Sequence, residues 1–332
     1  MTQHSGSVDE ALLKQIEDHA TVIAREAGAI LAGHFGSALD VQYKDKKETD
    51  PVTNADKETQ EYLEKAILER FPDHGILGEE QDGDDADKER AGKEPAKDIV
   101  WVLDPLDGTK NYLAGLPLFA SSIGVMHRGV PIAAAVYLPW PAEGGGVVLH
   151  ARRGGGAFAA DKPISVVDSD EPKGNGMVTL PGGFGMMFRF KKPMRGKVGD
   201  VRMTGSIAYE LAMVARGVTQ FTVTTAPKLW DVAGGVLLVQ EAGGLVMRGH
   251  RTTRALGLSR GMRWEPMEAL VADWQSGKTT MKQLRDWSAI TFLGNPNVVR
   301  YVTSNISTKA SLRRRLRRAI RSAWGKMRKI EG

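Results

Sequence analysis

Apolar residues recur at helical spacing over the first part of the chain. Ser7-Val8-Asp9-Glu10 has the pattern of a capping box, which predicts a helix start, and Gly33 or Gly36 should end this helix. A second helix is predicted from about 55 to 70, with Pro72 closing it. The apolar positions that define the first helix are Leu12, Ile16, Ile23, Ala27, Ile30 and Leu31.

Short apolar runs follow and predict strands. Residues 99–103 form a continuous apolar run, typical of a strand buried on both faces, that ends at Asp104-Pro105. The runs at 118–126, 132–138 and 146–151 are separated by Gly, Pro or charge. We expect them to be consecutive antiparallel strands of one sheet.

Beyond about residue 161, strand and helix patterns alternate, which predicts a second α/β layer with its own sheet. The expected strands are 164–167, 177–180, 219–223 and 245–247, and the expected helices lie near 206–215 and 232–241. We therefore expect an N-terminal α+β domain at 1–160, a C-terminal α/β domain at 161–308 and a tail at 309–332.

Two segments are too polar for a buried element. Residues 37–53 read as an exposed, mobile hairpin or loop, and residues 82–98 as a surface insertion.

Composition narrows the class of protein. A hydrophobic content of 42% with 26% charged residues is typical of a folded protein. The 332 residues include no cysteine, which excludes disulfides, thiolate metal sites and a thiol nucleophile. The first residues do not have the pattern of a secretory signal, and we expect a cytoplasmic protein without a spanning helix.

The net charge of +5 is unevenly distributed. Residues 309–332 hold 10 Lys and Arg against one acid, so the other residues carry 35 basic and 39 acidic side chains. Apolar residues recur at helical spacing in this tail, which predicts a basic amphipathic helix. Such a helix contacts an anionic membrane surface or RNA, or else docks on the body with its arginines in solvent.

Acidic residues stand where a carboxylate is costly. Asp104 directly follows the buried strand, Asp107 comes three residues later, and Glu79-Glu80 follows another apolar stretch. Two carboxylates this close require a shared proton or a multivalent cation, and hard oxygen ligands favour Mg²⁺. Taken alone, the Asp104/Asp107 pair also fits a solvated turn, and Asp231 also fits a helix N-cap.

The full string WVLDPLDGTKNY, at 101–112, resembles the signature of the inositol monophosphatase family of Mg²⁺-dependent, lithium-sensitive sugar phosphatases. The other matches, in order, are DPVTNADKETQ at 50–60, LGEE at 77–80, Gly-Ser-Ile-Ala at 205–208 and WDVAGG at 230–235. The resemblance implies a layered αβαβα fold with two sheets, a homodimer and a phosphomonoesterase with two or three Mg²⁺ ions.

The resemblance also assigns metal ligands. Glu79, Asp104 and the carbonyl of Leu106 match the ligands of a first Mg²⁺. Asp104, Asp107 and Asp231 match those of a second, and Glu79 with water would help hold a third.

Other residues match the family's catalytic and phosphate-binding positions. Thr109 and Asp56 match the pair that orients and deprotonates the attacking water. Asp50, at the start of the same motif as Asp56, is either part of this site or a loop residue. Since the sequence has no cysteine, a thiol nucleophile is not indicated, and water is the expected acceptor. Phosphate is expected on backbone amides of Gly108, Thr109, Gly205, Ser206 and Ile207.

The substrate alcohol is less constrained. Inositol-preferring members carry an acidic residue before the WD motif, but residues 211–230 contain none, and Thr224 has the corresponding spacing. Lys228 is either a contact for a second anionic group or a solvated lysine. The basic segment 184–202 leaves the same choice open. We expect an inositol monophosphate-like substrate; the alternatives are fructose-1,6-bisphosphatase, 3′-phosphoadenosine 5′-phosphate phosphatase or histidinol-phosphate phosphatase activity, or a phosphatase-fold protein that binds RNA or a membrane through its tail.

Overall fold

The computed structural model describes residues 8–80, 92–140, 145–253 and 260–309. A seven-stranded sheet has the strand order β3-β4-β5-β6-β7-β8-β9. β3 is parallel to β4, and each later neighbour is antiparallel. Its strands are β3 (Gly75–Gly78), β4 (Ile99–Asp107), β5 (Ala120–His127), β6 (Val130–Leu138), β7 (Val147–Arg152), β8 (Gly156–Ala159) and β9 (Lys162–Pro163).

A second, six-stranded sheet has the order β12-β10-β13-β16-β14-β15. Its strands are β10 (Met177–Thr179), β12 (Asp200–Arg202), β13 (Thr219–Thr224), β14 (Leu245–Thr253), β15 (Arg260–Pro266) and β16 (Ile290–Gly294). Two small antiparallel sheets pair β1 (Val41–Tyr43) with β2 (Pro51–Thr53), and β11 (Phe188–Phe190) with β17 (Ile306–Thr308).

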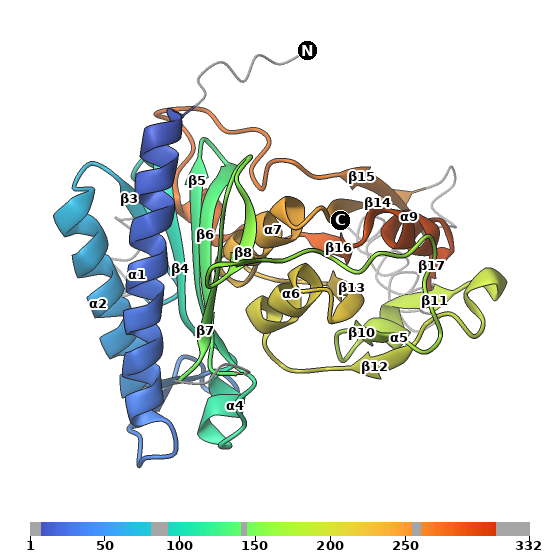
Figure 1. The fold of residues 1–332 in the computed structure, drawn as a ribbon, viewed down its shortest axis with the longest axis horizontal. Helices are drawn as coiled ribbons and strands as arrows, with labels where there is room; N and C mark the ends of the chain where they lie inside the picture. Colours follow the sequence, from blue (N-terminus) through green and yellow to red (C-terminus); the bar gives the residue numbers. More distant parts are fainter. Residues whose placement is uncertain (1–7, 81–91, 141–144, 254–259, 310–332) are drawn as a thin grey trace, which may run out of the picture.

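Helices complete five layers (Figure 1). α1 (Glu10–His34) and α2 (Asn54–Arg70) cover the outer face of the first sheet. α6 (Ile207–Ala215) and α7 (Leu229–Glu241) fill the space between the two sheets, and α9 (Pro296–Ser304) packs on the far side of the second. The short elements are α4 (Thr109–Leu113), α5 (Phe184–Met187), η1 (Lys192–Met194) and α8 (Met281–Arg285). The predicted layered αβαβα fold is confirmed.

Close packing fixes α7 against the first sheet. A side chain at Gly124 of β5 would lie only 2.6 Å from the backbone of Ala233 and Gly234 in α7. Because no side chain separates them, helix and strand approach closely, and the start of α7 is held next to the ends of β3 and β4.

Several expected elements differ in the structure. β4 does not end at Asp104-Pro105 but continues to Asp107 through a register irregularity, because pairing with β5 resumes after Pro105. Residues 164–167 form no strand; the amide of Val166 instead donates to the carbonyl of Ala242. The charged segment 37–53 contains a hairpin as predicted, but its second strand, Pro51–Thr53, is buried under α2 and α4.

The start of α1 also differs from the prediction. Asp9 is its N-cap residue, and it makes no side-chain capping bond. Ser7 lies outside the described residues, as do most of segment 82–98 and the predicted tail helix beyond Lys309. Within the described residues, no helix is both long and apolar enough to cross a bilayer. The division into domains at residue 160 stays a prediction.

A buried acid joins α1 to the first sheet. Glu17 is 3% exposed; its carboxylate accepts from Nη1 of Arg152 at 2.9 Å and lies 2.7 Å from Nδ1 of His150. The hydrogen bond with Glu17 raises the pKa of His150. Burial raises the pKa of Glu17, but His150 and Arg152 outweigh it, so the net direction is downward.

This contact should make stability depend on pH. The His150 contribution is fully present below its ordinary pKa of 6.5 and is lost as pH rises through the raised value. We expect the unfolding free energy of wild type to exceed that of His150→Gln by about 1 kcal/mol near pH 6, with the difference shrinking toward pH 9. Denaturant unfolding at several pH values measures it, with His250→Gln, which removes a more exposed histidine 3.2 Å from Glu265, as the control. A difference that does not vary with pH would contradict this account.

Candidate active site

The ends of β3 and β4 bring two acids to one edge of the first sheet. Gly78 pairs with Leu103 in the parallel register, and the amide of Glu79 donates to the carbonyl of Leu103 at 3.0 Å. Glu79 therefore leaves β3 beside Asp104, which is 1% exposed. The Asp104 carboxylate accepts from the amide of Leu106 at 3.2 Å, so the chain turns around it.

Asp107, at the end of β4, and Asp231, in α7, complete the acidic group. Asp107 accepts from the hydroxyl of Ser206 at 2.9 Å and from the amide of Ala208, both at the start of α6. Asp231 is the third residue of α7 and accepts from the amide of Lys228 at 2.8 Å. Asp231 is therefore not an N-cap residue, although it does bond back to the N-cap amide.

Burial and mutual repulsion act on these carboxylates together. Burial raises the pKa of Asp104 well above its usual value, and the negative charges of Glu79, Asp107 and Asp231 raise it further. The pKa of Asp107 is raised in the same way, first by burial and then by Asp231. Burial also raises the pKa of Asp231 to about 7. Four acids thus share one site, which is costly without a cation nearby.

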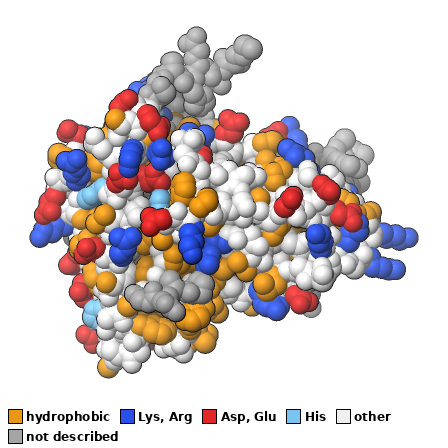
Figure 2. All heavy atoms as spheres, viewed as in Figure 1, with side chains coloured by type: hydrophobic (Ala, Val, Ile, Leu, Met, Phe, Trp, Pro, Cys, Tyr) orange, Lys and Arg blue, Asp and Glu red, His pale blue; other side chains and the backbone are white. Residues whose placement is uncertain are grey.

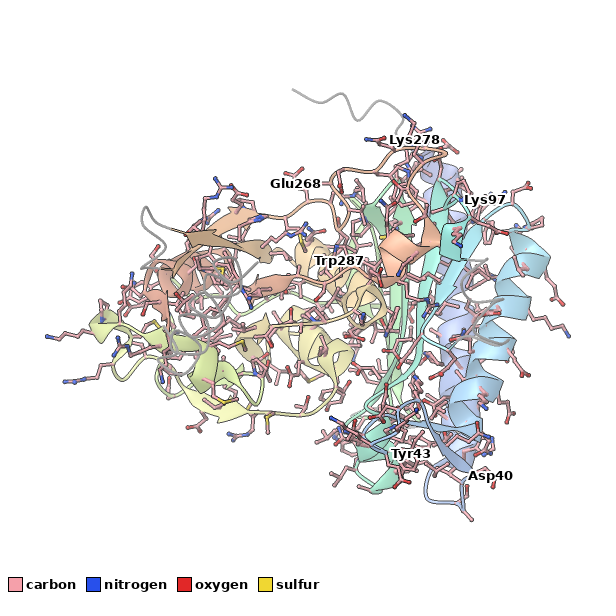
Figure 3. The ribbon with its side chains drawn as sticks, turned by 180° about the vertical axis from the view of Figure 1, so that it is seen from behind. Asp40, Tyr43, Lys97, Glu268, Lys278 and Trp287 are labelled. Atoms are coloured by element: carbon pink, nitrogen blue, oxygen red, sulfur yellow. The ribbon has the colours of Figure 1, made fainter. Side chains whose placement is uncertain are left out.

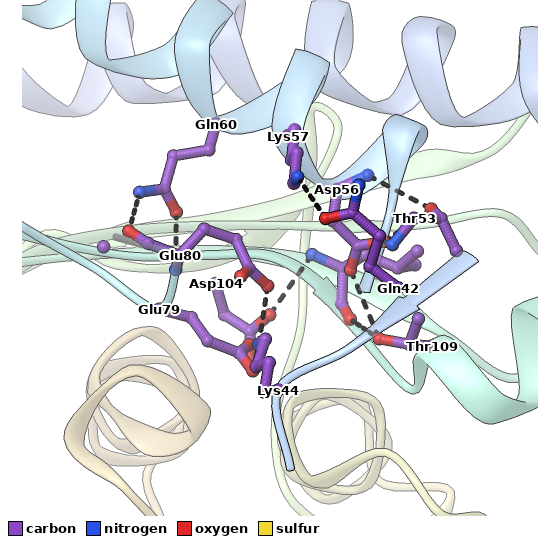
Figure 4. A network of polar contacts seen from close by, with 12 residues as sticks. Gln42, Lys44, Thr53, Asp56, Lys57, Gln60, Glu79, Glu80, Asp104 and Thr109 are labelled. Atoms are coloured by element: carbon purple, nitrogen blue, oxygen red, sulfur yellow. Dashed lines mark hydrogen bonds and ion pairs between the residues drawn. The ribbon is translucent and has the colours of Figure 1, made fainter. Parts of the chain in front are cut away.

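Lys44 supplies one cation (Figure 4). Its ammonium lies 2.7 Å from Oε1 of Glu79 and 2.6 Å from Oε1 of Glu80, with 26% of its side chain exposed. Burial alone would lower the pKa of Lys44, but the two carboxylates reverse this and raise it. Lys44 was not among the site residues predicted from the sequence, because its highly charged segment has the pattern of a solvated loop.

Asp56 and Thr109 form a second pair, beside the carboxylates. The Thr109 hydroxyl lies 3.3 Å from Oδ1 of Asp56 and 3.1 Å from the carbonyl of Leu106 (Figure 4). The other Asp56 oxygen accepts from the amide and hydroxyl of Thr53 at 2.8 and 2.6 Å, as part of the capping box of α2. Burial raises the pKa of Asp56 to about 6. The structure thus brings together the two residues that the sequence paired.

The backbone is shaped around Gly108. This residue has φ of +100°, and a Cβ there would lie 3.0 Å from the carbonyl of Leu118 and 3.1 Å from Ser206. Only glycine fits both constraints. Gly205-Ser206 and Ile207 begin α6 directly across from Gly108, so the predicted phosphate-contacting segments lie together.

Thr224 and Lys228, the two residues considered for substrate choice, differ in exposure. Thr224 is 2% exposed, and its hydroxyl is paired with that of Thr291 at 2.7 Å. Lys228 is exposed, with its ammonium 6.0 Å from the centre of the Trp230 ring. Asp50 is exposed at the end of the β1–β2 turn.

The donor set suits a hard divalent cation. Carboxylates and a backbone carbonyl are the oxygen ligands that Mg²⁺ prefers, and their raised pKa values show that positive charge is in demand there. In the described part of the chain, no three His, Asp or Glu side chains already stand in metal-ligating geometry, and Glu79 faces Lys44 instead. By the type of their oxygen donors and by their common location, these residues fit Mg²⁺.

Comparison with known proteins identifies the chain's relatives. The model of the inositol monophosphatase family matches residues 12–281. The chain belongs to the inositol monophosphatase family. This phosphatase is 33% identical over 243 residues to the fructose-1,6-bisphosphatase/inositol-1-monophosphatase of Aquifex aeolicus, covering 70% of this chain and 85% of that protein. It is 35% identical over 232 residues to Nus factor SuhB of Pasteurella multocida, covering 67% and 81%.

Solved structures have the same fold. The Thermotoga maritima IMPase is 25% identical, with a TM-score of 0.64 over 88% of this phosphatase and 96% of that chain. The SuhB protein of Bartonella henselae has a TM-score of 0.64 at 24% identity, covering 88% and 98%. The expected family and enzyme class are confirmed: the chain is a phosphatase that hydrolyses phosphomonoesters.

Repulsion among the buried acids should reduce stability when divalent ions are removed. In EDTA at pH 8, we expect Asp104→Asn to melt roughly 2–4 °C above wild type, because the amide keeps the size of the side chain and removes a buried charge. Added Mg²⁺ should raise the melting temperature of wild type and not that of the variant. Exposed Asp286→Asn is the control. An Asp104→Asn protein that melts lower in EDTA would show that its charge stabilises the fold.

Proposed function

We propose that this phosphatase uses Mg²⁺ and water to hydrolyse a small phosphorylated polyol or sugar, similar to inositol monophosphate. The observation that carries the proposal is the meeting of Glu79, Asp104, Asp107 and Asp231 at one buried site beside the Asp56–Thr109 pair. Acids are concentrated there far beyond what stability would favour.

The ligand roles follow the family resemblance. Glu79, Asp104 and the carbonyl of Leu106 would hold one Mg²⁺. Asp104, Asp107 and Asp231 would hold a second, and Glu79 would help hold a third through water. Bound Mg²⁺ supplies a Lewis acid that lowers the pKa of water and offsets charge on the phosphoryl oxygens and leaving alkoxide.

Asp56 and Thr109 would manage the proton of the attacking water. Thr53 occupies one Asp56 oxygen, which leaves the other to accept the hydroxyl proton of Thr109. The Thr109 oxygen can then accept a hydrogen bond from water and orient it. As the water attacks, its proton passes to Thr109 while the Thr109 proton passes to Asp56.

The phosphate would lie between Gly108 and the start of α6. Amides of Gly108 and Thr109 on one side, and of Gly205, Ser206 and Ile207 on the other, are the expected donors. The amide of Ala208 already donates to Asp107, so the helix end also orients a proposed metal ligand.

Substrate choice rests on residues that differ from the inositol-preferring pattern. Thr224 has no carboxylate to bind ring hydroxyls, and its own hydroxyl is buried and paired with that of Thr291. Exposed Lys228 near Asp231 favours a substrate with a second anionic group. The bisphosphate and nucleotide alternatives therefore belong in the same assay, and the Aquifex relative's name includes fructose-1,6-bisphosphatase.

A second candidate function is contact with a polyanion, RNA or an anionic membrane, through residues 309–332. Lys and Arg side chains project from the end of the molecule near β11 (Figure 2). Exposed Arg189, Lys191, Lys192 and Arg195 lie there, and Lys309 bonds to the carbonyl of Met187. The tail begins at this basic end. Several relatives are named Nus factor SuhB. From the family resemblance, we also propose that the protein is a cytoplasmic homodimer.

The first test is phosphate release at several Mg²⁺ concentrations. The substrates are myo-inositol 1-phosphate, fructose 1,6-bisphosphate, 3′-phosphoadenosine 5′-phosphate and histidinol phosphate. We expect Mg²⁺-dependent turnover that Asp107→Asn abolishes without unfolding the protein, because the change removes a ligand. Exposed Asp200→Asn should match wild type. Full activity in Asp107→Asn would show that the metal site is misassigned.

The proton pathway has a separate test. We expect Thr109→Ala to lower kcat about 100-fold while the Mg²⁺ requirement is unchanged. Asp56→Asn should have a similar effect, and the double variant should be no slower than the worse single variant, because the two residues act as one unit. Additive losses would show that Thr109 and Asp56 act independently.

A further inference from the structure

Arg285 contacts the backbone next to the carboxylate site, and no function was predicted for its segment from the sequence. It is the last residue of α8, in the connection from β15 to β16, four residues past the end of the family match at residue 281. Its guanidinium donates to the carbonyl of Gly78 at 2.6 Å and to the carbonyl of Glu79 at 3.2 Å. These two carbonyls flank the Cα of Glu79 in the chain.

The same guanidinium also contacts the helix that carries Asp231. Its central carbon lies 5.1 Å from the centre of the Trp230 ring, within cation–π range. Trp230 is 7% exposed and directly precedes Asp231. One rigid, planar cation therefore bridges the end of β3, from the first sheet, and the start of α7, from the layer between the sheets.

Arg285 is itself firmly held. The connection, which includes Glu268, Lys278 and Trp287, passes the first sheet near Lys97 (Figure 3). The hydroxyl of Ser276 donates to Asp98 at 2.6 Å, the amide of Ala96 to the carbonyl of Thr279 at 2.7 Å, and the Trp287 indole to the carbonyl of Leu270 at 2.7 Å. Before α8, the segment is thus bound to residues just ahead of β4, and after α8 it folds back on its own earlier part through Trp287.

Electrostatics also favour an arginine here. Burial lowers the pKa of Arg285 from its usual value, while Glu79, Glu80 and Asp286 oppose that effect. An arginine remains charged when partly buried, and its forked donors match two neighbouring carbonyls. A lysine could match neither the fork nor the stacking on Trp230.

We propose that Arg285 is a positioning residue for the metal site, which sets the separation of Glu79 and Asp231 by binding the end of β3 and the face of Trp230 at once. This inference rests on the proposed function, because it concerns the same ligands. The simpler alternative is that Arg285 only attaches the connection to the sheet. The two accounts differ in what they predict for metal affinity.

The test uses the full-length protein stripped of metal, with Mn²⁺ as the probe. Calorimetry or electron paramagnetic resonance gives Mn²⁺ affinity without turnover, and phosphate release gives the Mg²⁺ concentration for half-activation. We expect Arg285→Gln to weaken Mn²⁺ binding and raise the half-activating Mg²⁺ concentration by about 10-fold or more, with kcat at saturating Mg²⁺ changed far less. Arg285→Lys should lie between Gln and wild type.

Lys282→Gln is the matched control, since it removes an exposed cation from the same helix. If Arg285→Gln is too unstable to assay, the Mn²⁺ affinity of Arg285→Lys is the deciding measurement. A variant that melts lower than wild type but binds Mn²⁺ equally well overturns the proposal and shows that Arg285 has only a structural role. Wild-type protein that binds Mn²⁺ but hydrolyses no ester in the panel overturns the proposed function alone, because the affinity comparison still tests Arg285.

Discussion

Repulsion among buried carboxylates is the constraint on which the rest of the structure depends. Asp104 and Asp107 lie at the end of one strand, with Glu79 beside them and Asp231 opposite, and burial raises the pKa of each aspartate. Such a group persists only if the surrounding chain holds it in place. Lys44, Arg285 and the start of α6 each supply positive charge or donors to it from a different element.

The two-sheet architecture makes this convergence feasible. Glu79 and Asp104 come from adjacent parallel strands, whereas Asp231 comes from a helix packed between the sheets. The glycine contact between β5 and α7 lets that helix lie close enough to share the site. The hydrogen bonds from Ser206 and Ala208 to Asp107 join α6 to the same edge. The site therefore lies at the interface between the first sheet and the helix layer, and the packing of both layers contributes to its geometry.

Sequence patterns predicted the parts of this arrangement that depend on local order. The long helices and the antiparallel strands after residue 118 follow from periodicity, and the paired Asp56 and Thr109 follow from the family motifs. Lys44 and Arg285 were missed for different physical reasons. Lys44 sits among charges that look solvated, and its contact with Glu79 depends on how the hairpin folds back. Arg285 binds a carbonyl 206 residues away, through backbone atoms that carry no residue identity.

The misjudged end of β4 has a consequence for how this site can vary. Side chains along a strand alternate between faces, so Asp104 and Asp107, three residues apart, would point to opposite sides of a regular strand. The irregularity between them removes that alternation. An odd spacing therefore fits this site only together with the irregularity, and deleting or inserting one residue between the two acids would change the backbone path that brings them together. The length of this segment is thus as constrained as its composition.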